Sequence, residues 1–189
     1  MNLMRIVQIA TIVWALSEVM LIVMTRRNRH GASPRDRGSR TLLWCVIGAG
    51  IAAGTALQSV TAARIRLPEV WVLDVSLLLL VAGFAVRWTA IFTLGRFFST
   101  SVAIHQDHRL VRTGLYCLVR HPSYSGLLLL FLGMGLSFGN WLSLAVIVAP
   151  FLAALLYRIQ VEESSLMEAL GDDYVDYCKT TKRLLPGLF

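Results

Sequence analysis

The sequence predicts an all-α membrane protein with about five transmembrane helices, the last two of which form a helical hairpin. Hydrophobic residues make up 56% of the 189 residues and charged residues 15%, whereas soluble domains average about 45–50% and about 25%. Several apolar stretches reach the roughly 20 residues that a membrane crossing requires. This composition excludes a disordered chain. Three scattered cysteines, Cys45, Cys117 and Cys178, form no disulfide framework.

Five apolar stretches are expected to cross the membrane. They comprise residues 3–24, 41–63, 70–93, 123–138 and 141–159. Because only Gly139 and Asn140 separate the last two stretches, these helices are expected to lie antiparallel to each other. The fourth stretch is short for a full crossing, which leaves open an alternative with four spans and a re-entrant hairpin.

The distribution of positive charge predicts the orientation. The loop 25–40 carries six arginines against one acid, Asp36, and cytoplasmic loops are enriched in Lys and Arg. With that loop inside, fourteen basic residues lie inside and three outside. The N-terminus is then outside, and the C-terminus and active site are cytoplasmic, in the plasma membrane of a prokaryote or the endoplasmic reticulum of a eukaryote. Since topology accounts for the basic residues, no nucleic-acid partner is expected.

The chain is expected to form a single integral membrane domain over residues 1–189. Residues 1–93 contain three apolar spans with few polar side chains, whereas most His, Tyr and acidic residues lie in 94–126 and 158–183. Both polar segments flank the hairpin on the predicted cytoplasmic side. Residues 94–189 are therefore the expected catalytic part, with a cytosolic pocket. The sequence leaves the oligomeric state open.

Glycines in the predicted helices indicate close packing. Gly48, Gly50 and Gly54 resemble a dinucleotide-binding fingerprint, but that motif requires a preceding strand, and an apolar helix surrounds these glycines. The spacing of Gly50 and Gly54 is typical of closely packed membrane helices. Gly135 and Gly139 have the same spacing and the same interpretation.

Two charged residues inside the membrane are expected to pair. Glu18 and Arg87 each lie a few residues from the cytoplasmic ends of the first and third spans. At 1.5 Å per residue they reach a similar depth of roughly 9 Å. An intramembrane charge requires a partner, so an ion pair between these spans is predicted.

The segment 108–126 precedes and enters the fourth span. Gly114 permits a turn, and Pro122 suits the first turn of a helix, so the span is expected to begin near His121–Pro122. Free N–H groups from Ser123 and Tyr124 onward would attract a carboxylate or phosphate. Together with Tyr116, Tyr124 offers an aromatic face for an adenine or a sulfonium cation. An interfacial aromatic and basic belt explains the same residues without a ligand.

Arg158 and Glu162 lie at the end of the last span, four residues apart, and therefore share one face of a helix. They form either an ordinary salt bridge or an anion clamp. In the clamp, Arg158 binds a carboxylate through two parallel N–H bonds, and Glu162 holds the guanidinium in place. Gly171 is expected to end this helix and Asp172 to cap another.

Metal binding is not expected. His105, His108, Cys117 and His121 lie within one segment, but their spacing matches no recurrent zinc pattern. No pair of carboxylates accompanies them there. No residue is therefore predicted to bind a metal.

Together these segments resemble the isoprenylcysteine carboxyl methyltransferase family, integral membrane enzymes that use S-adenosyl-L-methionine. The matching elements are His108-Arg-Leu-Val, Gly114-Leu-Tyr, Arg120-His-Pro-Ser-Tyr-Ser-Gly, Arg158-x-x-x-Glu-Glu and Gly171-Asp-Asp-Tyr-x-x-Tyr. The resemblance covers about half of the chain, from residue 97 to the end. Because related phospholipid methyltransferases share the core motif, it specifies the cofactor better than the acceptor.

The resemblance implies carboxyl O-methylation of a lipidic, prenylcysteine-like acceptor at the membrane, with S-adenosyl-L-methionine as cofactor. It implies a cofactor site made of His108, Arg109, Leu110, Val111, Tyr116, His121, Pro122, Ser123 and Tyr124. It also implies catalytic roles on the acceptor side for Arg158 and Glu162. Some family members have a cofactor-contacting glutamine upstream of the His-x-Leu-Val segment, where residues 101–104 here read Ser-Val-Ala-Ile.

Three other functions are compatible with the same residues. A phospholipid amine N-methyltransferase would need a base, and Glu162 or Glu163 could serve. A nicotinamide-dependent membrane reductase could share a similar C-terminal arrangement. A non-catalytic protein would use these motifs as interfacial anchors against membrane lipid.

Overall fold

The computed structural model describes residues 2–27, 33–34, 38–95, 98, 103–104 and 110–187. The helices in these ranges are α1 (Leu3–Arg27), α2 (Ser39–Leu57), α3 (Glu69–Leu94), α4 (Pro122–Ser137), α5 (Trp141–Leu170) and α6 (Asp172–Thr180). Short 3-10 turns lie at Thr61–Ala63 and Gly114–Cys117. Strands β1 (Ser33–Pro34) and β2 (Ala103–Ile104) form a two-residue antiparallel ladder. The predicted all-α membrane fold is confirmed, with this ladder as a small addition.

Within the described ranges, the four helices α1, α2, α3 and α5 are long and apolar enough to cross a membrane. Their outward faces carry large exposed apolar side chains, such as Leu16 at 63% and Leu78 at 68% exposed, as expected where helices contact lipid tails. The 16 residues of α4 rise about 24 Å, less than the roughly 30 Å of the hydrocarbon core. Helix α2 ends at Leu57, earlier than predicted, because polar Gln58 and Ser59 interrupt the apolar run.

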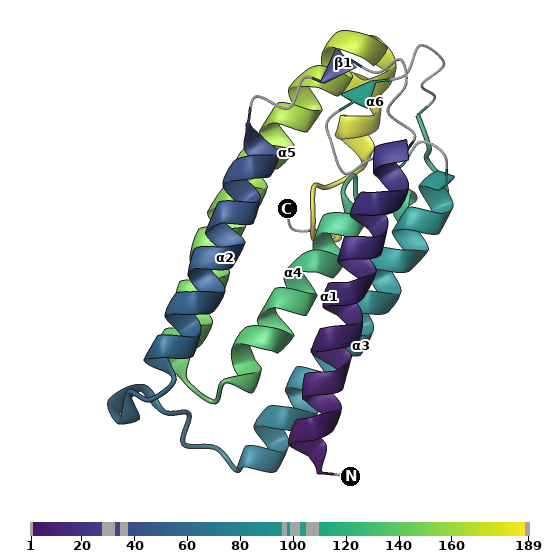
Figure 1. Ribbon diagram of the computed structural model, residues 1–189. Coiled ribbons are helices and arrows are strands. Elements are labelled where there is room, and N and C mark those ends of the chain that lie inside the picture. Colours follow the sequence, from purple (N-terminus) through teal and green to yellow (C-terminus); the bar gives the residue numbers. More distant parts are fainter. Residues whose placement is uncertain are drawn as a thin grey trace.

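The helices form two groups that diverge from the turn between α4 and α5 (Figure 1). Helix α5 packs chiefly on α2, whereas α4 packs chiefly on α3, with α1 also against α3. The first residues of α2 and α4 and the last residues of α1, α3 and α5 lie toward the same end of the bundle, the upper end in Figure 1. The polar segments of the chain therefore meet at one end, between the two groups.

The hairpin between α4 and α5 is confirmed, and hydrogen bonds hold its turn. The Asn140 side chain accepts hydrogen bonds from two backbone N–H groups in the first turn of α5 and donates to the Val60 carbonyl at 2.9 Å. The carbonyl of Gly139 accepts from Ile65 N at 2.8 Å. With φ at +64° and open space around it, Gly139 forms the turn, so the prediction that it packs between helices is wrong. Gly135 does pack, since a Cβ there would lie 2.9 Å from a side chain of α5.

Within each of the two helix groups, glycines allow the backbones of neighbouring helices to approach closely. A Cβ on Gly54 would lie 2.6 Å from the Cδ1 atom of Ile147, which confirms the predicted packing role of Gly50 and Gly54 between α2 and α5. The contact of α3 with α4 depends on Gly83 and Gly126. A Cβ on either one would lie 2.7 Å from the carbonyl oxygen of the other.

Replacing Gly83 by Ala is expected to destabilise the protein by about 1–3 kcal/mol, because the new methyl group must displace backbone atoms of α4. The measurement is the thermal unfolding midpoint in detergent. Gly48→Ala is the matched control, since its Cβ position has no atom within 4 Å beyond the adjoining backbone of its own helix and Ala favours the helix. Equal unfolding temperatures for both variants would contradict the close contact of α3 and α4.

Candidate active site

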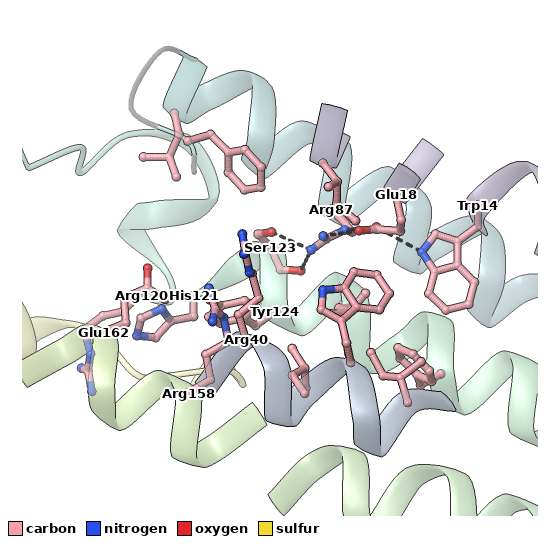
Figure 2. Close-up of a pocket in the computed structure, with 18 of the residues that line it drawn as sticks. Trp14, Glu18, Arg40, Arg87, Arg120, His121, Ser123, Tyr124, Arg158 and Glu162 are labelled. Atoms are coloured by element: carbon pink, nitrogen blue, oxygen red, sulfur yellow. Dashed lines mark hydrogen bonds and ion pairs between the residues drawn. The ribbon is translucent and has the colours of Figure 1, made fainter. Parts of the chain in front are cut away.

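A cavity of 510 Å³ lies between the two helix groups, within the range of about 300–1,000 Å³ that is usual for small-molecule sites. One part is apolar, and its lining includes Leu43, Ile47, Ile51, Leu127, Phe131 and Met134 from α2 and α4. The other part is polar, and its lining includes Arg40, Arg120, His121, Tyr124, Arg158 and Glu162 (Figure 2). The cavity can therefore accommodate a ligand with a charged end and an apolar end.

A chain of hydrogen bonds joins the two predicted catalytic residues. Arg158, only 3% exposed, donates from Nε to the Tyr124 hydroxyl at 2.9 Å. Tyr124 donates in turn to Oε2 of Glu162 at 2.7 Å. The observed link from Arg158 to Glu162 thus runs through Tyr124, rather than directly as the spacing on the helix predicts. A further bond from Nη1 of Arg158 to Ser39 Oγ, at 3.1 Å, ties the guanidinium to the first turn of α2.

Helix α4 begins as predicted, with Pro122 as its first residue and His121 before it. The carbonyl of His121 accepts hydrogen bonds from Tyr124 N at 2.9 Å and from Ser125 N at 3.0 Å. The prediction that the Tyr124 N–H is free is therefore wrong, because a tight first turn satisfies it within the helix.

Glu163, the second glutamate of the Arg158-x-x-x-Glu-Glu motif, connects two arginines and a histidine. Its carboxylate lies 2.9 Å from Arg120 Nε, 3.3 Å from His121 Nε2 and 2.9 Å from Arg183 Nη2. Arg120 also donates to the carbonyl of Thr181 in the C-terminal tail. Glu163 is only 3% exposed. It therefore fixes the segment before α4 and the tail against α5.

The predicted ion pair between Glu18 and Arg87 is confirmed. Both guanidinium atoms Nε and Nη2 contact the carboxylate, the latter at 2.6 Å. Trp14 Nε1 donates to the same carboxylate at 3.2 Å. From Nη1, Arg87 donates to both the hydroxyl and the carbonyl of Ser123, at 2.9 and 3.1 Å. The pair lines the cavity and joins α1 and α3 to the start of α4 (Figure 2).

Three buried tyrosines contribute to the cavity wall. Tyr116, Tyr174 and Tyr177 all line it. Burial raises the pKa of Tyr177 to about 12 and raises the pKa of Tyr116 and Tyr174 above the usual range, so all three phenols are neutral at physiological pH. Helix α6, which carries two of them, follows Gly171, whose φ is +54°. Gly171 rather than Asp172 is the cap, a shift of one residue from the prediction.

The cavity brings together most of the predicted site residues. Its lining includes Leu110, Val111, Tyr116, His121, Ser123, Tyr124, Arg158 and Glu162. Pro122 is buried as the first residue of α4 and supports the helix start. His105, His108 and Arg109, as well as residues 101–102, lie outside the described residues.

Other lining residues were not predicted as site residues. They include Arg40, Arg120, Trp14, Tyr174 and Tyr177. Tyr174 and Tyr177 lie in the Gly171-Asp-Asp-Tyr-x-x-Tyr motif, one of the elements of the family resemblance, and this motif could have indicated that they belong to the site. Arg40 ends an arginine-rich loop whose charge was already explained by topology. Only the packing of α2 on α5 shows that it faces the cavity.

Comparisons with known proteins match part of the chain. The isoprenylcysteine carboxyl methyltransferase (ICMT) family matches residues 76–168. The chain is 36% identical over 121 residues to protein-S-isoprenylcysteine O-methyltransferase B of Arabidopsis thaliana, covering 61% of this chain and 60% of that protein. It is 37% identical over 102 residues to protein-S-isoprenylcysteine O-methyltransferase of Saccharomyces cerevisiae, covering 53% of this chain and 43% of that protein.

A solved structure of the eukaryotic intramembrane Ras methyltransferase ICMT is similar at a TM-score of 0.55 and 33% sequence identity, covering 62% of this chain and 43% of that chain. The matches thus span less than two thirds of these relatives. The matched residues 76–168 contain the start of α4 together with Arg158 and Glu162. This part of the chain therefore matches the isoprenylcysteine carboxyl methyltransferase family, as its motifs predict.

Proposed function

We propose that this chain transfers a methyl group from S-adenosyl-L-methionine to the carboxylate of a prenylcysteine-like lipid. The observation that carries the proposal is the hydrogen-bonded chain of Arg158, Tyr124 and Glu162 at the polar end of a largely apolar cavity. The family match of residues 76–168 supports the reaction type. The relatives named above are isoprenylcysteine O-methyltransferases.

The charges at the polar end favour an anionic acceptor. Among the described residues that line that end, Arg40, Arg120 and Arg158 carry guanidinium groups and Glu162 carries a carboxylate. A guanidinium binds a carboxylate through two parallel N–H bonds. Because Tyr124 and Ser39 orient the Arg158 guanidinium, we assign Arg158 to the acceptor carboxylate. Glu162 holds Tyr124, and through it the guanidinium.

The start of α4 fits the cofactor. The rings of Tyr116 and Tyr124 line the cavity and offer electron-rich faces to a sulfonium cation. Ser123 lies in the first turn of α4 and His121 directly before it, where the positive end of the helix dipole favours a carboxylate. When bound, S-adenosyl-L-methionine would supply an electrophilic methyl group to a carboxylate oxygen, and the sulfur would leave as a thioether with the electron pair of the broken bond.

The residues around the site are arranged for positioning rather than for proton transfer. A carboxylate acceptor is ionised near pH 7, so no base is needed, and alignment of the two reactants supplies most of the rate. An amine acceptor would need a base. However, Glu162 accepts a hydrogen bond from the Tyr124 hydroxyl, and the carboxylate of Glu163 contacts Arg120, His121 and Arg183. The structure therefore favours carboxyl over amine methylation.

The position of the cavity supports a membrane-embedded acceptor. Its apolar part extends between α1 and α2, whose outer faces are apolar, and we propose that the lipid enters sideways between them. We also propose one domain over 1–189, in which α1–α3 complete a site centred on residues 94–189. The N-terminus would be outside and the polar end cytoplasmic, because arginines concentrate at that end.

The test uses the purified full chain in detergent with methyl-labelled S-adenosyl-L-methionine. Three probes are compared: N-acetyl-S-farnesylcysteine, its carboxamide and phosphatidylethanolamine. We expect label that is released by base only with the free carboxylate. Transfer to the ethanolamine lipid, or to none of the three probes, would refute the proposal.

Tyr124→Phe is expected to lower turnover about tenfold, because loss of the hydroxyl separates Arg158 from Glu162 and leaves the guanidinium less well oriented. Steady-state kinetics with the farnesylated acceptor measure the effect. Tyr157→Phe is the matched control, since Tyr157 is 41% exposed on the same helix as Arg158. Equal turnover of the two variants would show that the hydroxyl has no part in alignment.

A further inference from the structure

The buried pair of Glu18 and Arg87 joins a helix outside the family match to the first turn of α4. Glu18 lies on α1, before residue 76 where the match begins. The two side chains are 12% and 7% exposed. Both line the same cavity as Tyr124 and Arg158.

Arg87 contacts the α4 backbone at the residue that precedes Tyr124. Its Nη1 atom donates to the carbonyl and the hydroxyl of Ser123 at 3.1 and 2.9 Å, while the other two nitrogens of the guanidinium bind Glu18. The backbones also approach closely, since a Cβ on Gly126 would lie 2.6 Å from Arg87 N. One planar guanidinium thus fixes the turn that carries Tyr124.

Stability alone does not account for this pair. A buried ion pair pays a large desolvation cost, and replacing such a pair by apolar residues of similar volume is often neutral or stabilising. Its geometric effect is specific, because an Arg fork bound on one side by a carboxylate keeps a fixed orientation. Here the oriented guanidinium hydrogen-bonds to Ser123 and thereby restrains the backbone of the next residue, Tyr124.

We propose that Glu18 and Arg87 are positioning residues for methyl transfer. Glu18 orients Arg87, and Arg87 holds the first turn of α4 so that the Tyr124 hydroxyl stays between Arg158 and Glu162. The role in catalysis rests on the proposed methyl transfer. The effect on the first turn of α4 does not depend on it.

Two variants test the proposal, each compared with the wild-type chain. Arg87→Lys keeps the charge opposite Glu18 but loses the planar fork. The double variant Glu18→Leu/Arg87→Met removes the pair and keeps similar volumes. Asp74→Asn is the matched control, an exposed acid on the same helix as Arg87.

Turnover of the farnesylated acceptor is expected to fall about 10- to 100-fold in both variants, while the unfolding temperature of the double variant stays within about 2 °C of wild type. Hydrogen–deuterium exchange gives a readout independent of activity. The amides of Tyr124 and Ser125, which bond to His121, should exchange at least about tenfold faster, with exchange in α2 unchanged.

Unchanged turnover together with a stable fold would overturn the catalytic role. Unchanged exchange at Tyr124 and Ser125 would overturn the proposal altogether. If the wild-type chain methylates none of the acceptors, the proposed function fails, and the exchange measurement alone decides whether the pair positions α4.

Discussion

Arg158→Ala is expected to reduce methyl transfer by about 10²–10³-fold while leaving cofactor affinity near that of the wild type. The guanidinium is buried and oriented by Tyr124 and Ser39, and loss of a preorganised charged donor typically has an effect of that size. Steady-state kinetics give the turnover, and isothermal titration with S-adenosylhomocysteine gives the cofactor affinity.

Arg158→Lys separates charge from geometry. Lysine keeps the positive charge but lacks the planar fork, so most of the loss should remain. Arg66→Lys, in the exposed loop between α2 and α3, should leave turnover unchanged. Loss of cofactor binding with retained turnover at saturating cofactor would reassign Arg158 to the cofactor side.

Glu163→Gln is expected to destabilise the protein by about 3–5 kcal/mol. The neutral amide leaves Arg120 and His121 in a buried position without the carboxylate that they contact at 2.9 and 3.3 Å, and removing one partner of a buried ion pair typically has this cost. Thermal unfolding in detergent measures the change. The tail, held through Arg183, should become more sensitive to proteolysis.

Glu168→Gln is the control for Glu163→Gln, because Glu168 is exposed on the same helix. Its unfolding temperature should lie close to that of the wild type. If Glu163→Gln unfolded no earlier than this control, the contacts of Glu163 with Arg120 and His121 would contribute little to the fold.

Local patterns predicted those features that depend on nearby residues. The turn at Gly139 and Asn140, the start of α4 at Pro122 and the break at Gly171 follow from the conformational preferences of Gly, Asn and Pro. The pairing of Glu18 with Arg87 could also be predicted, because helix rise alone gives the depth of each charge.

Features that depend on how distant helices pack could not be predicted in this way. The spacing of Arg158 and Glu162 favours a direct bond, and only the approach of α4 to α5 places the Tyr124 hydroxyl between them. Likewise, neighbouring glutamates on a helix point about 100° apart, but the sequence does not show which one meets Arg120. Helix packing assigns that contact to Glu163.

Helices α4 and α5 diverge from the turn that connects them, and the site lies between the two helix groups at the end away from this turn (Figure 1). A rotation of about 2° at this turn moves the far end of α4, roughly 24 Å away, by about 1 Å, and a misplacement of that size can cost about 100-fold in rate. Bonds from Asn140 to Val60 and from Ile65 to the turn resist such a rotation. The loop between α2 and α3 thus contributes to the relative placement of Tyr124 and Arg158 at the opposite end of the bundle, in addition to their own hydrogen bond.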